Sequence, residues 1–144
     1  MDAYENLRLE NQLCFPLYAC AKEIVRQYRK PLEPLGLTYT QYIVMMALWE
    51  SGDMAENELG NRVHLDSGTL TPLLKRLEKQ GLIDRKRSLS DERRLLVSLS
   101  EKGTALRKQA VHVPAAMQGC VQLSEEEAMQ LKQLLNKALG NMNR

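Results

Sequence analysis

The chain has 144 residues, enough for a single domain with a buried core. Apolar residues make up 44% and charged residues 26%, which is typical of globular proteins, and the longest apolar run (43–49) is too short to span a membrane. The net charge of +2 does not by itself indicate a nucleic-acid partner. Three scattered cysteines fit neither a disulfide framework nor a zinc site, so we expect a cytoplasmic protein with reduced thiols and no metal or cofactor.

The N-terminal region predicts one long amphipathic helix, because apolar residues recur at helical spacing from about residue 6 to residue 29. Cys14 lies in the middle of this expected helix. Pro16 is expected to bend it, since proline removes one backbone hydrogen bond. Pro31 and Pro34 are expected to stop it.

Three further helices are expected in the centre of the chain. Thr40 is a candidate N-cap for the first of them, and the second covers about 55–63. Asp66 and Ser67 cap the third, and Gly81 stands where a helix C-cap is expected. The apolar stripe of this third helix follows the i, i+3, i+4, i+7 pattern: Leu70, Leu73, Leu74 and Leu77.

The C-terminal half begins with two short strand-like runs, 82–87 and 95–99, joined by a polar, charged turn. Ser100 opens a fifth helix that is expected to run toward position 120. Ser124 and Glu127 form a capping box for a sixth and last helix.

This order of elements predicts a mainly α fold with a small β-hairpin wing, a winged helix-turn-helix flanked by terminal helices. No repeat or long linker divides the chain, so we expect one domain over 1–144, with a winged-helix region over about 38–100. The terminal helices, about 6–30 and 101–143, are expected to mediate dimerisation, because the small central unit could not cover the apolar faces of both regions. The alternative is that these terminal helices pack against other helices of the same chain.

The segment 75–94 contains eight basic and four acidic residues, a local excess of positive charge on a nearly neutral chain. An α-helix fits the major groove of B-DNA, and small polar residues at its N-terminal end permit close approach to base edges. A basic hairpin can place an arginine in the adjacent minor groove. A solvated charged helix and hairpin is the alternative reading. The candidate DNA-binding residues are Asp66, Ser67, Gly68, Thr69, Thr71, Lys75, Arg76, Lys79, Arg85, Lys86, Arg87, Asp91, Arg93 and Arg94.

Residues 66–103, DSGTLTPLLKRLEKQGLIDRKRSLSDERRLLVSLSEKG, closely resemble the MarR family of winged-helix regulators. The DER of 91–93 matches the family's wing, in which the acid orients the structure and the arginine enters the minor groove. Residues 9–19, LENQLCFPLYA, resemble the OhrR-like branch that senses organic hydroperoxides. The resemblance implies a homodimeric repressor on a double-stranded DNA operator of imperfect palindromic sequence, with an organic hydroperoxide or another oxidant as the inducer.

The resemblance also implies roles for two of the three cysteines. Cys14 matches the peroxide-sensing cysteine, and Tyr18, Tyr28 and Tyr39 match tyrosines that hydrogen-bond to it from both subunits. Cys120 matches a resolving cysteine that forms an intersubunit disulfide with the oxidised sensor in some members. Without the family, a buried cysteine is more often a small apolar residue, and core packing is what we expect of Cys20.

Three other functions remain open at this point. A MarR-type repressor could instead be released by reversible binding of a phenolic ligand, without any cysteine chemistry. A thiol peroxidase would need an activating arginine near Cys14, but the nearest basic residue in the sequence, Arg8, is not an obvious neighbour, and we expect no enzyme. A protein-interaction module would leave the basic hairpin without a purpose.

Overall fold

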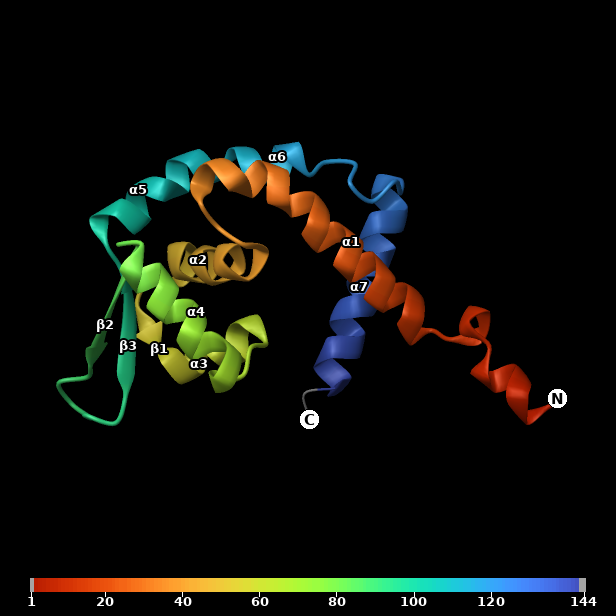
Figure 1. The fold of residues 1–144 in the computed structure, drawn as a ribbon, viewed down its shortest axis with the longest axis horizontal. Coiled ribbons are helices and arrows are strands. Elements are labelled where there is room, and N and C mark those ends of the chain that lie inside the picture. Colours follow the sequence, from red (N-terminus) through yellow and green to blue (C-terminus); the bar gives the residue numbers. More distant parts are fainter. Residues whose placement is uncertain (1, 143–144) are drawn as a thin grey trace. The chain divides into compact units, whose positions relative to one another are not determined.

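The computed structural model describes residues 2–142, and its elements follow the expected order closely (Figure 1). The helices are α1 (Cys14–Leu32), α2 (Tyr39–Ser51), α3 (Glu56–Val63), α4 (Ser67–Lys79), α5 (Glu101–Ala110), α6 (His112–Ala116) and α7 (Glu125–Met142). The strands are β1 (Met54–Ala55), β2 (Ile83–Arg87) and β3 (Leu95–Leu99), and three 3₁₀ helices are η1 (Ala3–Leu7), η2 (Leu9–Asn11) and η3 (Glu33–Leu35). The predicted mainly helical fold with a small β-hairpin wing is confirmed.

The first helix begins later than predicted, because η1 and η2 replace its expected N-terminal part. Asn11 donates a side-chain hydrogen bond to the Glu5 carbonyl, and Gln12 donates to the carbonyls of Asn6 and Arg8. Such side-chain bonds to the backbone compete with α-helix formation. The prediction that Cys14 lies in the middle of the helix is therefore wrong, since Cys14 is the first residue of α1.

The prolines of α1 have smaller effects than predicted. Pro16 lies in the first turn, where its missing N–H would have no helical partner, so no hydrogen bond is lost. Pro31 does not stop the helix, which continues to Leu32. Pro34 lies in the first turn of η3, and Gly36, with φ of 68°, ends that turn in the left-handed region.

The second helix is capped by Thr38 and not by Thr40 as predicted. The Thr38 hydroxyl accepts from the backbone N–H of Gln41, while the Gln41 side chain accepts from the Thr38 N–H. This capping box satisfies two backbone donors at once. The side-chain oxygen of Gln41 is therefore already used in holding the start of α2.

The predicted fifth helix is two helices, because α5 ends at Ala110 and α6 begins at His112. Pro114 has no N–H to donate to the Ala110 carbonyl, and its ring crowds that carbonyl, so a continuous helix is interrupted there. The capping box of the last helix is confirmed. Ser124 and Glu127 exchange hydrogen bonds of 3.0 and 3.1 Å, and the bond from the Ser124 backbone N–H lowers the Glu127 pKa.

The sheet is antiparallel with strand order β1-β3-β2. The hairpin of β2 and β3 pairs Ile83 with Leu99 at its base and Arg87 with Leu95 next to the turn. Sequence analysis missed β1, because a strand of two residues carries no periodic signal. Its pairing of Met54 with Val97 fixes the hairpin to the segment before α3.

The chain separates into two compact units, residues 28–116 and residues 1–27 with 117–144. The first unit has a core of large side chains that are at most 2% exposed, including Leu32, Met45, Leu48, Leu59, Leu70, Leu74, Leu77, Ile83 and Val97. The predicted stripe of α4 lies in this core, with Leu73 at 6% exposed. The assignment of 1–144 to one domain remains a prediction.

The terminal unit has almost no core of its own. Among its described residues only Met117 is buried. Large apolar side chains are exposed before and along α1 (Leu9, Leu13, Phe15, Leu17) and along α7 (Met129, Leu131, Leu134, Leu135, Leu139, Met142). Cys20, expected to pack in a core, is also exposed, because this part of α1 has no core of its own chain to face.

Replacing Gly103 by alanine should destabilise the protein strongly. A Cβ at this position would lie 2.0 Å from the backbone carbonyl oxygen of Leu82, so α5 and the start of β2 would have to separate. We expect the free energy of unfolding in urea to fall by about 3 kcal/mol. Gly140→Ala is the control, since its Cβ would meet no atom within 4 Å. Equal urea midpoints for Gly103→Ala and the wild type would contradict the packing described.

Candidate nucleic-acid interface and thiol site

The first turn of α4 presents small polar side chains to solvent. Ser67, Gly68 and Thr69 are exposed. Asp66 is the N-cap, and its carboxylate accepts from the Thr69 backbone N–H at 2.8 Å, so it holds the helix start in place. Thr71 is half-buried and donates a 2.9 Å hydrogen bond to Glu56 of α3, which leaves its hydroxyl committed within the chain.

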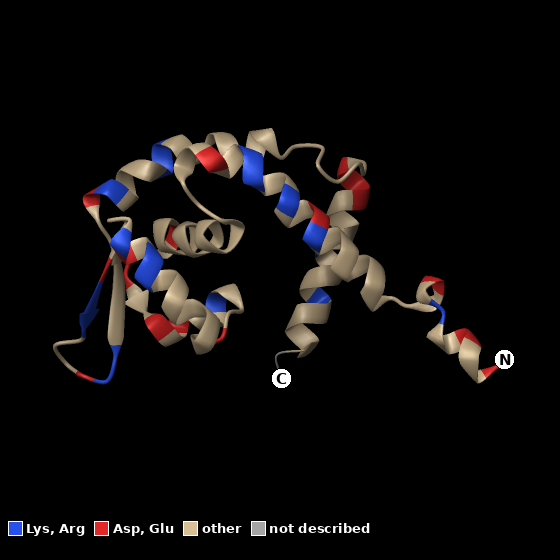
Figure 2. Ribbon diagram, in the orientation of Figure 1, with Lys and Arg blue, Asp and Glu red and all other residues tan. Residues whose placement is uncertain are grey.

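The basic residues of α4 are exposed and available to an outside partner. No carboxylate of residues 2–142 lies within ion-pair distance of Lys75, Arg76 or Lys79. Figure 2 shows basic residues in the C-terminal half of α4, next to the basic strand β2. Lys86 and Arg87 of β2 are also exposed. The buried leucines fix this orientation, since they hold the opposite side of α4 in the core.

The wing turn, residues 88–94, is shaped by its own polar groups. The Asp91 carboxylate accepts from the Arg93 backbone N–H at 3.0 Å, and its carbonyl accepts from the Arg94 N–H. Arg87 donates to the Glu92 carbonyl at 2.8 Å. The Arg93 side chain is exposed and forms no ion pair within the described chain, so the turn holds it ready for an outside partner.

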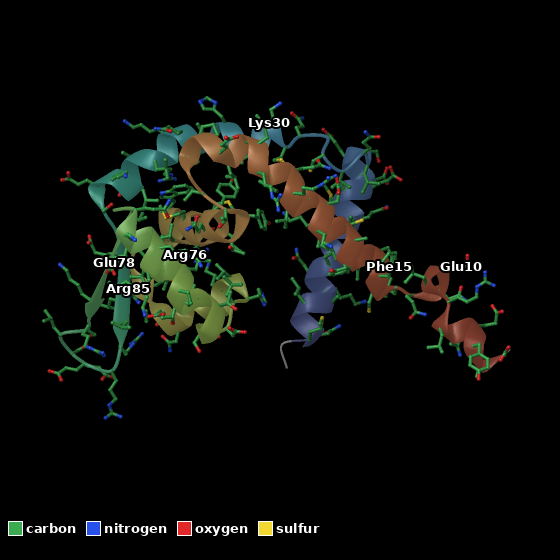
Figure 3. All side chains as sticks on the ribbon, in the orientation of Figure 1. Glu10, Phe15, Lys30, Arg76, Glu78 and Arg85 are labelled. Atoms are coloured by element: carbon green, nitrogen blue, oxygen red, sulfur yellow. The ribbon has the colours of Figure 1, made fainter. Side chains whose placement is uncertain are left out.

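Two predicted DNA-binding arginines form ion pairs within the chain. The Arg94 guanidinium lies 2.6 Å from the Glu58 carboxylate of α3 and ties the wing to that helix. Arg85 is largely buried and lies 3.5 Å from Glu78, at the C-terminal end of α4 (Figure 3). Sequence analysis missed Glu58, because nothing local links it to a residue 36 positions away.

Cys14 is an exposed thiol at the first residue of α1. The first turn of a helix has unpaired backbone N–H groups, which favour negative charge. Tyr18 follows one turn later and is 60% exposed. The Lys22 ammonium lies 5.3 Å from the centre of that ring, so a positive charge borders the tyrosine.

Three tyrosines form an aromatic cluster between the end of α1 and the start of α2. The rings of Tyr28 and Tyr39 are 4.7 Å apart between centres, and Tyr42 lies 5.8 Å from Tyr28 and 6.5 Å from Tyr39. Burial raises the pKa of Tyr42, and Tyr39 adds to the effect. The predicted residues Tyr28 and Tyr39 are thus brought together, while Tyr28 and Cys14 are fourteen positions apart on α1, about 21 Å of helix rise.

Cys120 follows α6 in a turn and not in a helix as predicted. Its backbone N–H donates to the Met117 carbonyl, and the preceding Gly119 has φ of 81°, a conformation that favours glycine. Cys120 is half-buried, and all three cysteines are free thiols. Within residues 2–142 there is no cluster of three potential metal ligands and no helix long and apolar enough to cross a membrane.

A separate groove of about 470 Å³ lies between η3 and the helices α5 and α6. Its lining is mainly apolar, with one ammonium and one imidazole: Pro31, Pro34, Leu35, Lys108, Gln109, His112, Val113 and Ala116.

Comparisons with known proteins identify the family. The family described as transcriptional regulator SarA/Rot matches residues 26–109. The organic hydroperoxide resistance transcriptional regulator of Bacillus subtilis (OhrR) is 45% identical over 99% of this chain and 97% of its own length.

Solved structures give the same result. AbfR of Staphylococcus epidermidis, reduced and bound to DNA, is 36% identical with a TM-score of 0.77 over 99% of this chain and all of that one. A disulfide form of AbfR has a TM-score of 0.62, with 35% identity over 94% of this chain and 95% of that one. A MarR variant of Escherichia coli with operator DNA is 25% identical, with a TM-score of 0.82 over 96% and 99%. The chain belongs to the MarR family of winged-helix transcriptional regulators, in the branch that includes OhrR.

Proposed function

We propose that the protein is a cytoplasmic transcriptional repressor that binds DNA as a homodimer and is released by oxidation of Cys14. The observation that carries DNA binding is the outward side of α4, where small polar residues and three cations without internal ion pairs lie opposite a buried leucine stripe. The relatives support it, because AbfR and MarR are seen bound to DNA and OhrR is named for resistance to organic hydroperoxides. It acts by binding and is not an enzyme.

In the proposed complex, the first turn of α4 enters the major groove. Ser67, Gly68 and Thr69 meet base edges, and Lys75, Arg76 and Lys79 contact phosphates. Arg93 of the wing enters the adjacent minor groove, with Lys86 and Arg87 near the backbone. Asp66, Thr71, Arg85, Asp91 and Arg94 support these residues through their internal hydrogen bonds and ion pairs.

A second copy of the chain is the proposed cover for the exposed apolar residues of the terminal unit. A soluble chain rarely exposes this many large apolar side chains on two helices without a partner. A twofold dimer places two copies of α4 in successive major grooves, about 34 Å apart, so the operator should be an imperfect palindrome.

In the proposed chemistry, the Cys14 thiolate attacks one oxygen of an organic hydroperoxide. An S–O bond forms and the O–O bond breaks, which gives a sulfenic acid and, after proton uptake, an alcohol. Tyr18 of the same helix, with Tyr28 and Tyr39 of the partner chain, would donate hydrogen bonds to the sulfur. Cys14 is exposed within its own chain, so in the proposed dimer the packing of the partner chain sets the access of the oxidant to it.

Cys120 of the partner chain then attacks the sulfenic sulfur. A disulfide forms and water leaves, so two thiols and one hydroperoxide give one disulfide, one alcohol and one water. A disulfide requires Cα atoms within about 7 Å, and closing it would shift the terminal helices that hold the two copies of α4 in groove register. A thiol reductant reverses the change.

The groove beside η3 favours a second candidate, release by a phenolic ligand. Its apolar lining fits an aromatic ring, and Lys108 and His112 offer partners for a hydroxyl or carboxylate. Salicylate that releases DNA from a Cys14→Ser protein would favour this candidate over the thiol mechanism.

Replacing Arg93 by alanine should weaken operator binding about tenfold, because the wing loses its minor-groove contact. The matched control is Lys30→Ala, which removes one positive charge from the end of α1, on the side of the first unit away from α4 (Figure 3). Binding is measured by fluorescence anisotropy on a duplex that the reduced protein selects from a random pool. Equal losses for the two variants would show that only net charge matters and would contradict the assigned face.

The cysteine assignment predicts a distinct result for each thiol. After one equivalent of tert-butyl hydroperoxide, wild type and Cys20→Ser should release the duplex and run as a disulfide-linked dimer on a non-reducing gel. Cys14→Ser should keep its DNA and stay monomeric on the gel, because the attacking thiolate is absent. Cys120→Ser should form no disulfide-linked band and should keep its DNA, because the closing disulfide is what shifts the terminal helices.

A full, reductant-reversible dimer band from Cys120→Ser would overturn the disulfide pairing. Release of DNA from oxidised Cys14→Ser would overturn the sensor role itself. The DNA-binding assignment would stand in both cases, because it rests on α4 and the wing.

A further inference from the structure

Gln80, at the C-terminal end of α4, uses both ends of its side-chain amide within the chain. Its Nε2 donates to the Gly36 carbonyl at 2.9 Å, and its Oε1 accepts from Gln41 Nε2 at 3.2 Å. Its backbone carbonyl accepts from Lys102 Nζ at 2.9 Å. One residue thereby joins the last turn of α4 to three other segments.

These segments join α4 to the turn after α1, to α2 and to α5, in addition to its contacts with α3 and β2. Gly36 ends the turn that directly follows α1 and η3, and Gln41 lies in the first turn of α2. Lys102 lies in the first turn of α5, which leads toward the C-terminal helices. All four residues belong to the compact unit of residues 28–116, so the network lies within that unit.

The network resists sliding of α4 against the turn after α1. Gln41 is only 7% exposed, and its Oε1 is held by the Thr38 backbone N–H. Within residues 2–142 its Nε2 has Gln80 as its one hydrogen-bond partner. A buried amide left unpaired is costly, and α4 therefore follows the Gly36 turn more readily than it separates from it.

We propose that Gln80 is the positioning residue that transmits displacement of α1 to the DNA-binding helix. The proposal rests on the proposed redox function, because it requires that oxidation shifts α1. Gln80 contacts neither DNA nor the oxidised thiol. It acts through the Gly36 carbonyl on one side and through the main chain of α4 on the other.

The test uses Gln80→Met, which keeps the length of the side chain and removes its hydrogen-bonding groups. Dissociation constants for the selected duplex are measured before and after tert-butyl hydroperoxide, with thermal unfolding followed in parallel. We expect the ratio of oxidised to reduced dissociation constants to fall about tenfold relative to wild type. Adding Gln41→Met should change the ratio no further, because both residues act in one network.

Glu101→Gln is the control, since Glu101 is an exposed neighbour of Lys102 without a side-chain partner in the described chain, and its ratio should equal that of wild type. A Gln80→Met protein with a wild-type ratio would overturn the proposal. Equal weakening of both dissociation constants together with a lower melting temperature would also overturn it, because that is the signature of a structural role alone. If wild type itself keeps DNA after oxidation, the proposed redox function fails instead.

Discussion

The burial of one side of α4 determines what the rest of the molecule can do. Leu70, Leu74 and Leu77 are at most 1% exposed, and removing any of them would leave a cavity in a small core. Because this side is fixed, the small residues of the first turn and the cations must face outward. Asp66 holds the start of α4 and Gln80 holds its end. The proposed DNA-binding surface is thus a consequence of packing and not of net charge.

The terminal unit differs, because most of the large apolar residues on its described helices are exposed within one chain. In the proposed dimer the partner chain covers these residues, so the packing of the unit depends on the partner. Cys14 and Cys120 both belong to this unit, whose packing would then depend on the partner chain. Chemistry at either thiol can therefore alter the dimer without disturbing the core around α4, which would allow reversible release of DNA.

The sequence predicted those features that depend on neighbouring residues. The caps Asp66, Ser100 and Ser124 were found, as were the α4 stripe and the hairpin, because each follows from a local pattern. Two other local features were missed, because the spacing of apolar residues does not reveal them. The late start of α1 follows side-chain hydrogen bonds from Asn11 and Gln12 to the backbone. The break before α6 follows the missing N–H of Pro114.

The missed parts of the candidate site are pairs that are distant in sequence. Glu58 with Arg94 and Gln41 with Gln80 are 36 and 39 positions apart. Neither pair has a signature in a single sequence, since charged and amide side chains are common in any protein and no local pattern shows which of them will meet. The proposed thiol roles rest on the family resemblance, and the structure adds that Cys14 is the first residue of α1 and is exposed in its own chain.

The most direct test of this account is the mass of the reduced protein by sedimentation equilibrium, alone and with the selected duplex. We predict two chains per particle in solution and two chains per duplex, because both the cover of the terminal helices and the spacing of the two α4 helices need a second copy. A stable monomer that binds the duplex as one chain would contradict the account. Its exposed apolar residues and its redox control would then both need another explanation.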